Sequence, residues 1–107
     1  MKILFDQGTP VPLRRAFGDH KVETTFERGW SELANGALVH AAESMGFDVF
    51  VTTDKNLRYQ QNLDGQQLAT LVLWTTTWPD IKPHAAAIAT AALALRPGEF
   101  RELGRPS

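Results

Sequence analysis

Residues 47–57 read FDVFVTTDKNL, an apolar and β-branched run that changes abruptly to polar residues. The core of this run, Val49-Phe50-Val51, shows no polar alternation, which is typical of a strand covered by helices on both faces. A strand covered in this way belongs to a parallel sheet. The segment therefore predicts a buried strand that ends near Asp54, so that this carboxylate stands at the carboxyl edge of the sheet.

The N-terminus repeats the same pattern over a shorter stretch. Residues 2–5 contain an apolar run that ends in Asp6, and Gln7, Gly8 and Pro10 then end the strand and begin a loop. Two buried strands are thus predicted, and each ends in an aspartate.

Hydrophobic periodicity and turn residues predict the remaining elements. These are a short helix over 11–17, an alternating edge strand over 21–26, a loop over 27–33, an amphipathic helix over 34–45, a short helix or turn over 56–62, a buried strand over 68–73 and an Ala-rich helix over 81–95. In the amphipathic helix the apolar stripe consists of residues 34, 37, 38, 41, 42 and 45. We expect Asn35 and Thr77 to be helix N-caps and Gly46 to end the first of the two helices in a left-handed conformation.

This order of elements predicts a single-domain α/β fold with a parallel sheet of about four strands and helices on both faces. The common strand order for such a sheet is 2-1-3-4, which places strand 1 beside strand 3 at the topological switch point, where open α/β sheets bind ligands. Residues 1–98 are expected to form the domain. Residues 99–107 are expected to form a polar tail that is frayed or adds a weak extra strand.

The composition excludes several classes of protein. The chain has 107 residues, a net charge of −1 and no cysteine, so it is too short for a second domain and lacks a global basic field for nucleic acid. The three histidines are too scattered for a zinc signature. No apolar run approaches the roughly 20 residues of a membrane span. The N-terminus does not resemble a secretory signal, and we expect a cytoplasmic protein with no membrane partner.

Two carboxylates at adjacent strand ends suggest a metal site. Neighbouring strands lie about 4.8 Å apart, so Asp6 and Asp54 would repel each other unless they shared a proton or a cation. Mg²⁺ and Mn²⁺ prefer oxygen ligands and can act on a phosphodiester. The polar residues expected to support them at the same edge are Thr53, Asn56, Thr75, Thr76 and Thr77. The alternative for each aspartate is that it caps the helix that follows.

Local contacts with nucleic acid are also predicted. Two basic clusters are candidates, Arg14 with Arg15 and Lys55 with Arg58, and the alternative for both is an ordinary solvated surface. The three tryptophans either stack on bases or anchor the core or a partner interface; they are Trp30, Trp74 and Trp78.

Three segments resemble the small PIN-like domains of predicted nucleases, many of them toxin components of bacterial toxin–antitoxin operons. The segments are LFDQGTPVPLRRAF (4–17), NGALVHAAESMGFD (35–48) and VTTDKNL (51–57), and the resemblance covers about residues 2–75. It implies a PIN-like fold, cleavage of RNA with Mg²⁺ or Mn²⁺ at an acidic cluster, and a small antitoxin protein as partner. A homodimer is a further expectation.

Carried over by position, Asp6 and Asp54 match acidic residues of the family. This chain departs from the family pattern at Gln7, Asn35 and Asn56, where relatives carry acids, so these three residues are predicted to support the site. The first functional hypothesis is a metal-dependent ribonuclease. The second is a PIN-like module that binds a protein partner or RNA without cleavage, and the third is a phosphate-binding or phosphoacceptor domain that uses Asp54.

Overall fold

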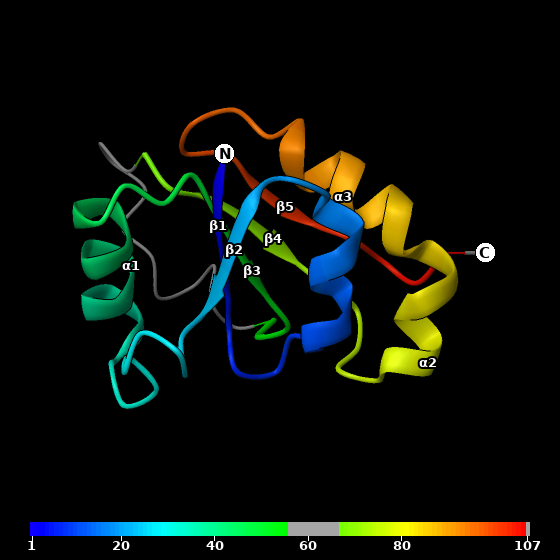
Figure 1. The fold of residues 1–107 in the computed structure, drawn as a ribbon, viewed down its shortest axis with the longest axis horizontal. Coiled ribbons are helices and arrows are strands. Elements are labelled where there is room, and N and C mark those ends of the chain that lie inside the picture. Colours follow the sequence, from blue (N-terminus) through cyan, green and yellow to red (C-terminus); the bar gives the residue numbers. More distant parts are fainter. Residues whose placement is uncertain (56–66, 107) are drawn as a thin grey trace.

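The computed structural model describes residues 1–55 and 67–106, which form a five-stranded parallel sheet with helices on both faces (Figure 1). The elements in chain order are β1 (Lys2–Phe5), the 3₁₀ helix η1 (Val11–Phe17), β2 (Lys21–Thr24), α1 (Asn35–Ser44), β3 (Val49–Thr52), β4 (Ala69–Val72), α2 (Trp78–Ile81), the 3₁₀ helix η3 (Lys82–His84), α3 (Ala85–Leu93) and β5 (Phe100–Glu102). Within the described residues, no helix is both long and apolar enough to cross a membrane. The predicted helix or turn over 56–62 lies outside the described residues.

The sheet has the order β2-β1-β3-β4-β5, and every neighbouring pair is parallel. The predicted α/β class and the order 2-1-3-4 are confirmed, with one strand more than expected. The additional strand is β5, which pairs with β4 and confirms the second of the two alternatives for residues 99–107, a weak extra strand. The Thr70 N–H donates to the Glu99 carbonyl and the Leu103 N–H donates to the Val72 carbonyl, both at 2.8 Å. Three residues are too few to show the periodicity of a strand, so the sheet continues past residue 98 without a clear signal in the sequence.

Alternate residues of the strands build a core on each face of the sheet. We define the α3-side core by Ile3, Phe5, Val49, Val51 and Leu71, which pack with buried residues of η1, α2 and α3. The α1-side core is smaller and consists of Leu4, Leu38, Val39, Ala42, Phe47, Phe50 and Leu68. Figure 1 shows α1 on one face, with η1, α2 and α3 on the other. Because both faces are covered, the run in β3 is apolar throughout, as predicted.

Helix α1 differs from the prediction in its N-cap and in the face that it buries. Its N-cap is Ala34 and Asn35 is its first residue, so the prediction of Asn35 as the cap is wrong. The stripe is also rotated: Val39 is buried, whereas Ala34, Ala37 and Met45 are exposed. Rotation toward the adjacent Leu38 and Val39 removes more apolar area from water than burial of alanines would. Gly46 has a φ of 80°, which confirms the predicted left-handed stop.

The predicted helix over 81–95 is interrupted. The structure divides this region into α2, η3 and α3, because Pro83 has no N–H to continue the helical hydrogen bonds. Thr77 occupies the N-cap position of α2 as predicted, although its side chain makes no capping hydrogen bond.

Candidate functional site

The site is built where β1 and β3 end side by side. Phe5 is paired with Val51, so Asp6 and Thr52 follow at the same edge of the sheet. The Asp6 N–H and the Thr9 hydroxyl both donate to the Val51 carbonyl, each at 2.9 Å. The loop that carries Asp6 is therefore tied to the end of β3.

The hydroxyl of Thr52 links the two predicted metal ligands. It donates to Asp6 Oδ2 at 2.7 Å and accepts a hydrogen bond from the Asp54 N–H at 3.1 Å. Thr52 is fully buried, so this hydroxyl occupies one position. One buried side chain thus brings the Asp6 carboxylate and the backbone of Asp54 together, at the predicted switch point.

The Asp6 carboxylate retains room for a further ligand. Its Oδ1 accepts from the Gln7 N–H at 2.9 Å and its Oδ2 accepts from Thr52, which leaves lone pairs on both oxygens. Asp6 and Asp54 are partly buried and remain accessible from the carboxyl edge. The capping alternative for Asp6 is wrong, because the N-cap of η1 is Pro10 and no side chain caps that helix.

Gly8 and Thr53 bring the loops after β1 and β3 into close contact. A Cβ placed on Gly8 would lie 2.4 Å from Thr53 Oγ1 and 3.4 Å from Thr76 Cγ2. Gly8 does not have a positive φ, so the position needs glycine for close approach and not for a left-handed backbone. Thr53 thus packs against the loop that carries Asp6.

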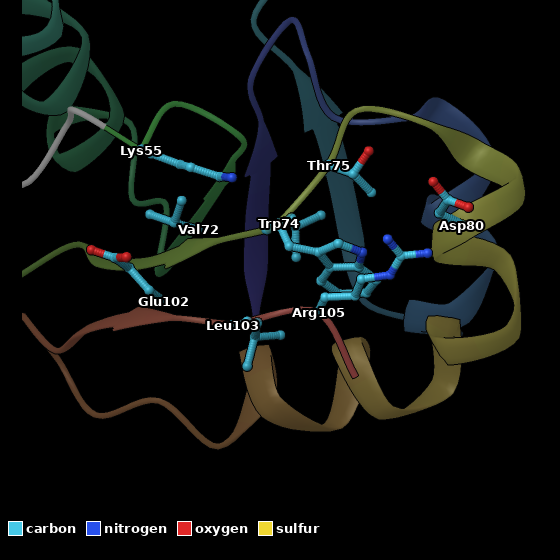
Figure 2. Close-up of a pocket in the computed structure, with 10 residues that line it drawn as sticks. Lys55, Val72, Trp74, Thr75, Asp80, Glu102, Leu103 and Arg105 are labelled. Atoms are coloured by element: carbon cyan, nitrogen blue, oxygen red, sulfur yellow. The ribbon is translucent and has the colours of Figure 1, made fainter. Parts of the chain in front are cut away.

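A pocket of about 500 Å³ lies at the carboxyl ends of β4 and β5 (Figure 2). The predicted residues Lys55 and Thr75 line it together with Val72, Leu73, Trp74, Asp80, Glu102, Leu103, Gly104 and Arg105. The aspartates of the β1–β3 edge are not among these residues, so the pocket adjoins the aspartate pair without enclosing it. The Thr75 hydroxyl accepts the Thr77 N–H at 3.1 Å and thus shapes its own loop.

The remaining predicted site residues lie in different parts of the chain. Gln7 is exposed beside Asp6, and Asn35 is the first residue of α1, after the 27–33 loop. Asn56 and Arg58 lie outside the described residues. The two remaining basic residues, Arg14 and Arg15, do not join Lys55; they line a separate groove with Trp78 and Lys82.

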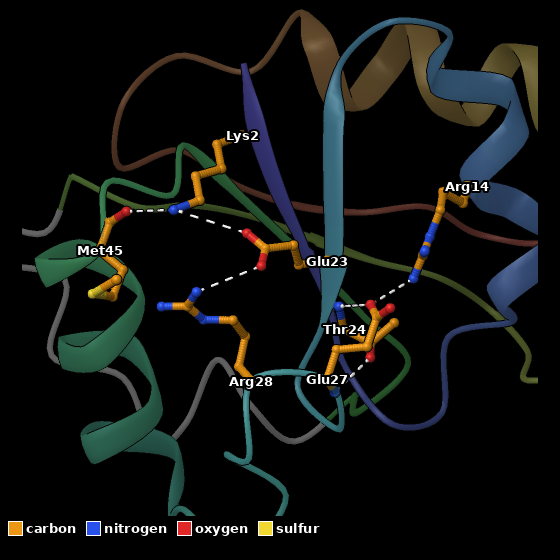
Figure 3. A network of polar contacts seen from close by, with 7 residues as sticks. All are labelled: Lys2, Arg14, Glu23, Thr24, Glu27, Arg28 and Met45. Atoms are coloured by element: carbon orange, nitrogen blue, oxygen red, sulfur yellow. Dashed lines mark hydrogen bonds and ion pairs between the residues drawn. The ribbon is translucent and has the colours of Figure 1, made fainter.

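Trp30 is an anchor of the α1-side core. Its ring meets Phe47 edge to face at 5.9 Å, and the Arg28 guanidinium lies 4.9 Å from the Trp30 ring centroid. Arg28 and Lys2 approach the Glu23 carboxylate at 3.5 and 3.9 Å (Figure 3). The structure thus favours the anchoring alternative for this tryptophan over base stacking.

Thr24 and Glu27 form a reciprocal capping box at the end of β2 (Figure 3). The Thr24 N–H donates to Glu27 Oε1 at 2.9 Å, and the Glu27 N–H donates to Thr24 Oγ1 at 3.0 Å. Arg14 donates to the same Glu27 oxygen at 2.6 Å. The hydrogen bond from Thr24 and the charge of Arg14 lower the pKa of Glu27 from its usual 4.5.

The folded-state pKa of Glu27 lies below its unfolded value, so the carboxylate stabilises the fold at neutral pH, and this contribution is lost as the pH falls through the folded pKa. We expect Glu27→Gln to lower the free energy of unfolding by at most about 1 kcal/mol at pH 7, since the pair is exposed. The difference should shrink as the pH falls through the folded pKa of Glu27. Urea denaturation over a series of pH values from neutral to acidic measures it, with the exposed Glu32→Gln as control; a pH-independent difference would contradict the role of the charge.

Several residues of the site are not predicted by the sequence. The sequence pattern indicates only that Thr52 belongs to a strand, that Gly8 ends a strand and that Glu27 lies in a loop. The one local signal is the Thr-x-x-Glu spacing of residues 24–27, which is typical of a capping box. The roles of Thr52 and Gly8 depend on contacts between segments far apart in the chain, which no local pattern reveals.

Within residues 1–55 and 67–106, no cluster of three or more His, Cys, Asp or Glu side chains lies close enough together to hold a metal ion. No protein-family model, curated protein or solved structure matches the chain. The function is therefore inferred from the geometry of the site itself.

Proposed function

We propose that this chain is a ribonuclease of PIN-like type that depends on Mg²⁺ or Mn²⁺, with Asp6 and Asp54 as the metal ligands. The observation that carries the proposal is the buried Thr52 hydroxyl, which contacts the Asp6 carboxylate and the Asp54 backbone at one sheet edge. This edge is the switch point of the sheet, where open α/β folds bind ligands.

The donor set fits the chemistry of these cations. Mg²⁺ commonly takes only one or two carboxylates and completes its octahedron with water and substrate phosphate. When bound, such a cation orients a water and stabilises charge on a phosphodiester. Thr52 holds the Asp6 carboxylate in one orientation, as hydrogen-bonded outer partners do for metal-ligating carboxylates. Gly8 and Thr53 hold the loop that carries Asp6 against the end of β3.

The partner and location that we propose follow from the resemblance and the composition. A small antitoxin protein would hold the activity in check, and the absence of cysteine fits a reducing compartment such as the cytoplasm.

Binding of RNA or of a protein without cleavage is the second candidate function. The observation that favours it is Gln7, an exposed amide directly beside Asp6, where the family resemblance leads us to expect an acid. An amide contributes no negative charge to the site, so fewer charges are available to hold a cation.

A metal titration tests the proposal. We expect Mn²⁺ to raise the melting temperature of the wild-type protein by roughly 10 °C once its concentration is about 100 times the Kd, since binding then adds about 2.7 kcal/mol. Asp54→Asn should abolish this rise, whereas Asp19→Asn, a matched change in the exposed turn before β2, should preserve it. The same rise in Asp54→Asn would remove Asp54 from the site.

An RNA assay then separates the two candidate functions. Wild-type protein with Mg²⁺ or Mn²⁺ is expected to cleave a fluorescent single-stranded RNA, and excess EDTA should stop the reaction. Metal binding at the aspartates without any cleavage would favour the binding module.

A further inference from the structure

A groove separate from the aspartates lies between η1 and α2. Its volume is about 510 Å³, and it is lined by Val11, Pro12, Arg14, Arg15, Trp78 and Lys82. Three of these six residues are cations, and none of the six is an acid. This local excess of positive charge stands out in a chain whose net charge is −1.

The three cations are not equivalent. The charge of Arg14 is neutralised in part by Glu27, since its Nη2 lies 2.6 Å from Glu27 Oε1. We therefore assign Arg14 a structural role in the lining of the groove. Arg15 and Lys82 are exposed, and neither has an ion-pair partner among the residues that the structure describes. They come from different elements and contribute two uncompensated charges to one groove.

Trp78 adds an aromatic surface to the same groove. It is partly buried, because it packs against the α3-side core, and it also lines the groove. Packing against the core holds the indole in place, so stacking on it would cost little conformational entropy. Val11 and Pro12 extend the apolar part of the lining.

Both walls of the groove start at the carboxyl edge of the sheet. η1 follows the loop that carries Asp6, and α2 follows the loop that leaves β4. The elements that line the groove therefore begin at the same edge of the sheet as Asp6 and Asp54.

We infer that this groove binds a single-stranded nucleic acid, with a base stacked on Trp78 and the flanking phosphates at Arg15 and Lys82. Non-specific binding of single strands characteristically combines aromatic stacking with a positively charged track. A duplex keeps its base faces stacked inside, and an acidic peptide would use the cations but not the indole face. The inference deepens the proposed function, since it assigns the surface that would hold the substrate of the aspartate site.

Fluorescence anisotropy in EDTA tests binding without any contribution from a metal. The probe is a short fluorescein-labelled RNA, compared with DNA of the same sequence, a blunt-ended RNA duplex and a hexaglutamate competitor. Single-stranded RNA and DNA are both expected to bind, whereas the duplex and the peptide should bind weakly.

The variants separate stacking from charge. Trp78→Leu keeps an apolar residue against the core but removes the aromatic face, and we expect a roughly 10-fold or greater loss of affinity. Trp78→Phe should retain most of the affinity. Arg15→Gln with Lys82→Gln should reduce the slope of log K against log salt by roughly 0.7 for each phosphate that the protein no longer neutralises. Lys21→Gln, an exposed cation on β2, is the matched control.

Wild-type affinity in both Trp78→Leu and the double glutamine variant would overturn the inference. Equal binding of the duplex, or a preference for hexaglutamate that Trp78→Leu leaves unchanged, would also overturn it. If Trp78→Leu does not fold, the double glutamine variant decides alone. If Mn²⁺ does not raise the melting temperature but single strands still bind, only the metal-dependent nuclease is rejected. If Mn²⁺ raises the melting temperature but single strands do not bind, only the groove is rejected.

Discussion

Replacement of Asp6 by asparagine is expected to reduce metal-dependent RNA cleavage by roughly 10- to 100-fold or more. Loss of an outer partner of a metal ligand typically costs roughly 10- to 100-fold, and loss of the ligand's charge should cost no less. Asparagine has the same shape and keeps an oxygen that can accept from Thr52 or from the Gln7 N–H, so the fold should be preserved. Initial rates on a fluorogenic single-stranded RNA at saturating Mg²⁺ measure the effect, and Asp19→Asn should cleave like the wild type.

Thr52 should act through the aspartates as a positioning residue. Thr52→Val removes both the donor to Asp6 and the acceptor for the Asp54 N–H, so we expect metal affinity to fall by roughly 10- to 100-fold. Thr52→Ser restores the hydroxyl and should recover most of the affinity. Wild-type metal affinity in Thr52→Val would show that its hydroxyl does not orient the ligands.

Replacement of Gly8 by alanine is expected to lower the free energy of unfolding by about 1–3 kcal/mol, the usual cost of overpacking. The new Cβ would lie 2.4 Å from Thr53 Oγ1, a distance that forces either the side chain or the loop to move. Urea denaturation measures the effect. Gly36→Ala is the control, because its Cβ would have nothing within 4 Å and alanine favours the helix.

A double substitution identifies the contact responsible. Thr53→Ala removes the clashing hydroxyl, so Gly8→Ala combined with Thr53→Ala should recover most of the stability. Gly8→Ala should also weaken metal binding, because the displaced loop carries Asp6. If Gly8→Ala has the free energy of unfolding of the wild type, the loop can move without loss of stability. The close approach of Gly8 and Thr53 would then not hold the two loops together.

Some features could be predicted from local pattern. The apolar runs of β1, β3 and β4 indicated strands buried on both faces, and burial of both faces leads to a parallel sheet. The predicted strand order was the one common to doubly wound sheets. The end of α1 at Gly46 was also predicted from local sequence, since glycine adopts the left-handed conformation without strain.

Other features depend on long-range contacts that override local preference. The burial of Val39 in α1 was not predicted, because it depends on what the sheet offers to that face of the helix. The sequence left open whether residues 99–107 fray or add a weak strand, and the open edge of β4, which supplies hydrogen-bonding partners, decides for the strand β5. The capping box of Thr24 and Glu27 could have been predicted from spacing alone, but its bond to Arg14 could not.

The sequence by itself determined that Asp6 and Asp54 follow two buried strands, because a strand's end is marked by its own change from apolar to polar residues. Only the tertiary structure decided that a hydroxyl from Thr52 joins them and that Gly8 must be small. It also brought Arg15, Trp78 and Lys82 into one groove. The physical reason is that hydrogen bonds and van der Waals contacts act over a few ångströms, so they depend on which distant segments pack together and not on their order in the chain.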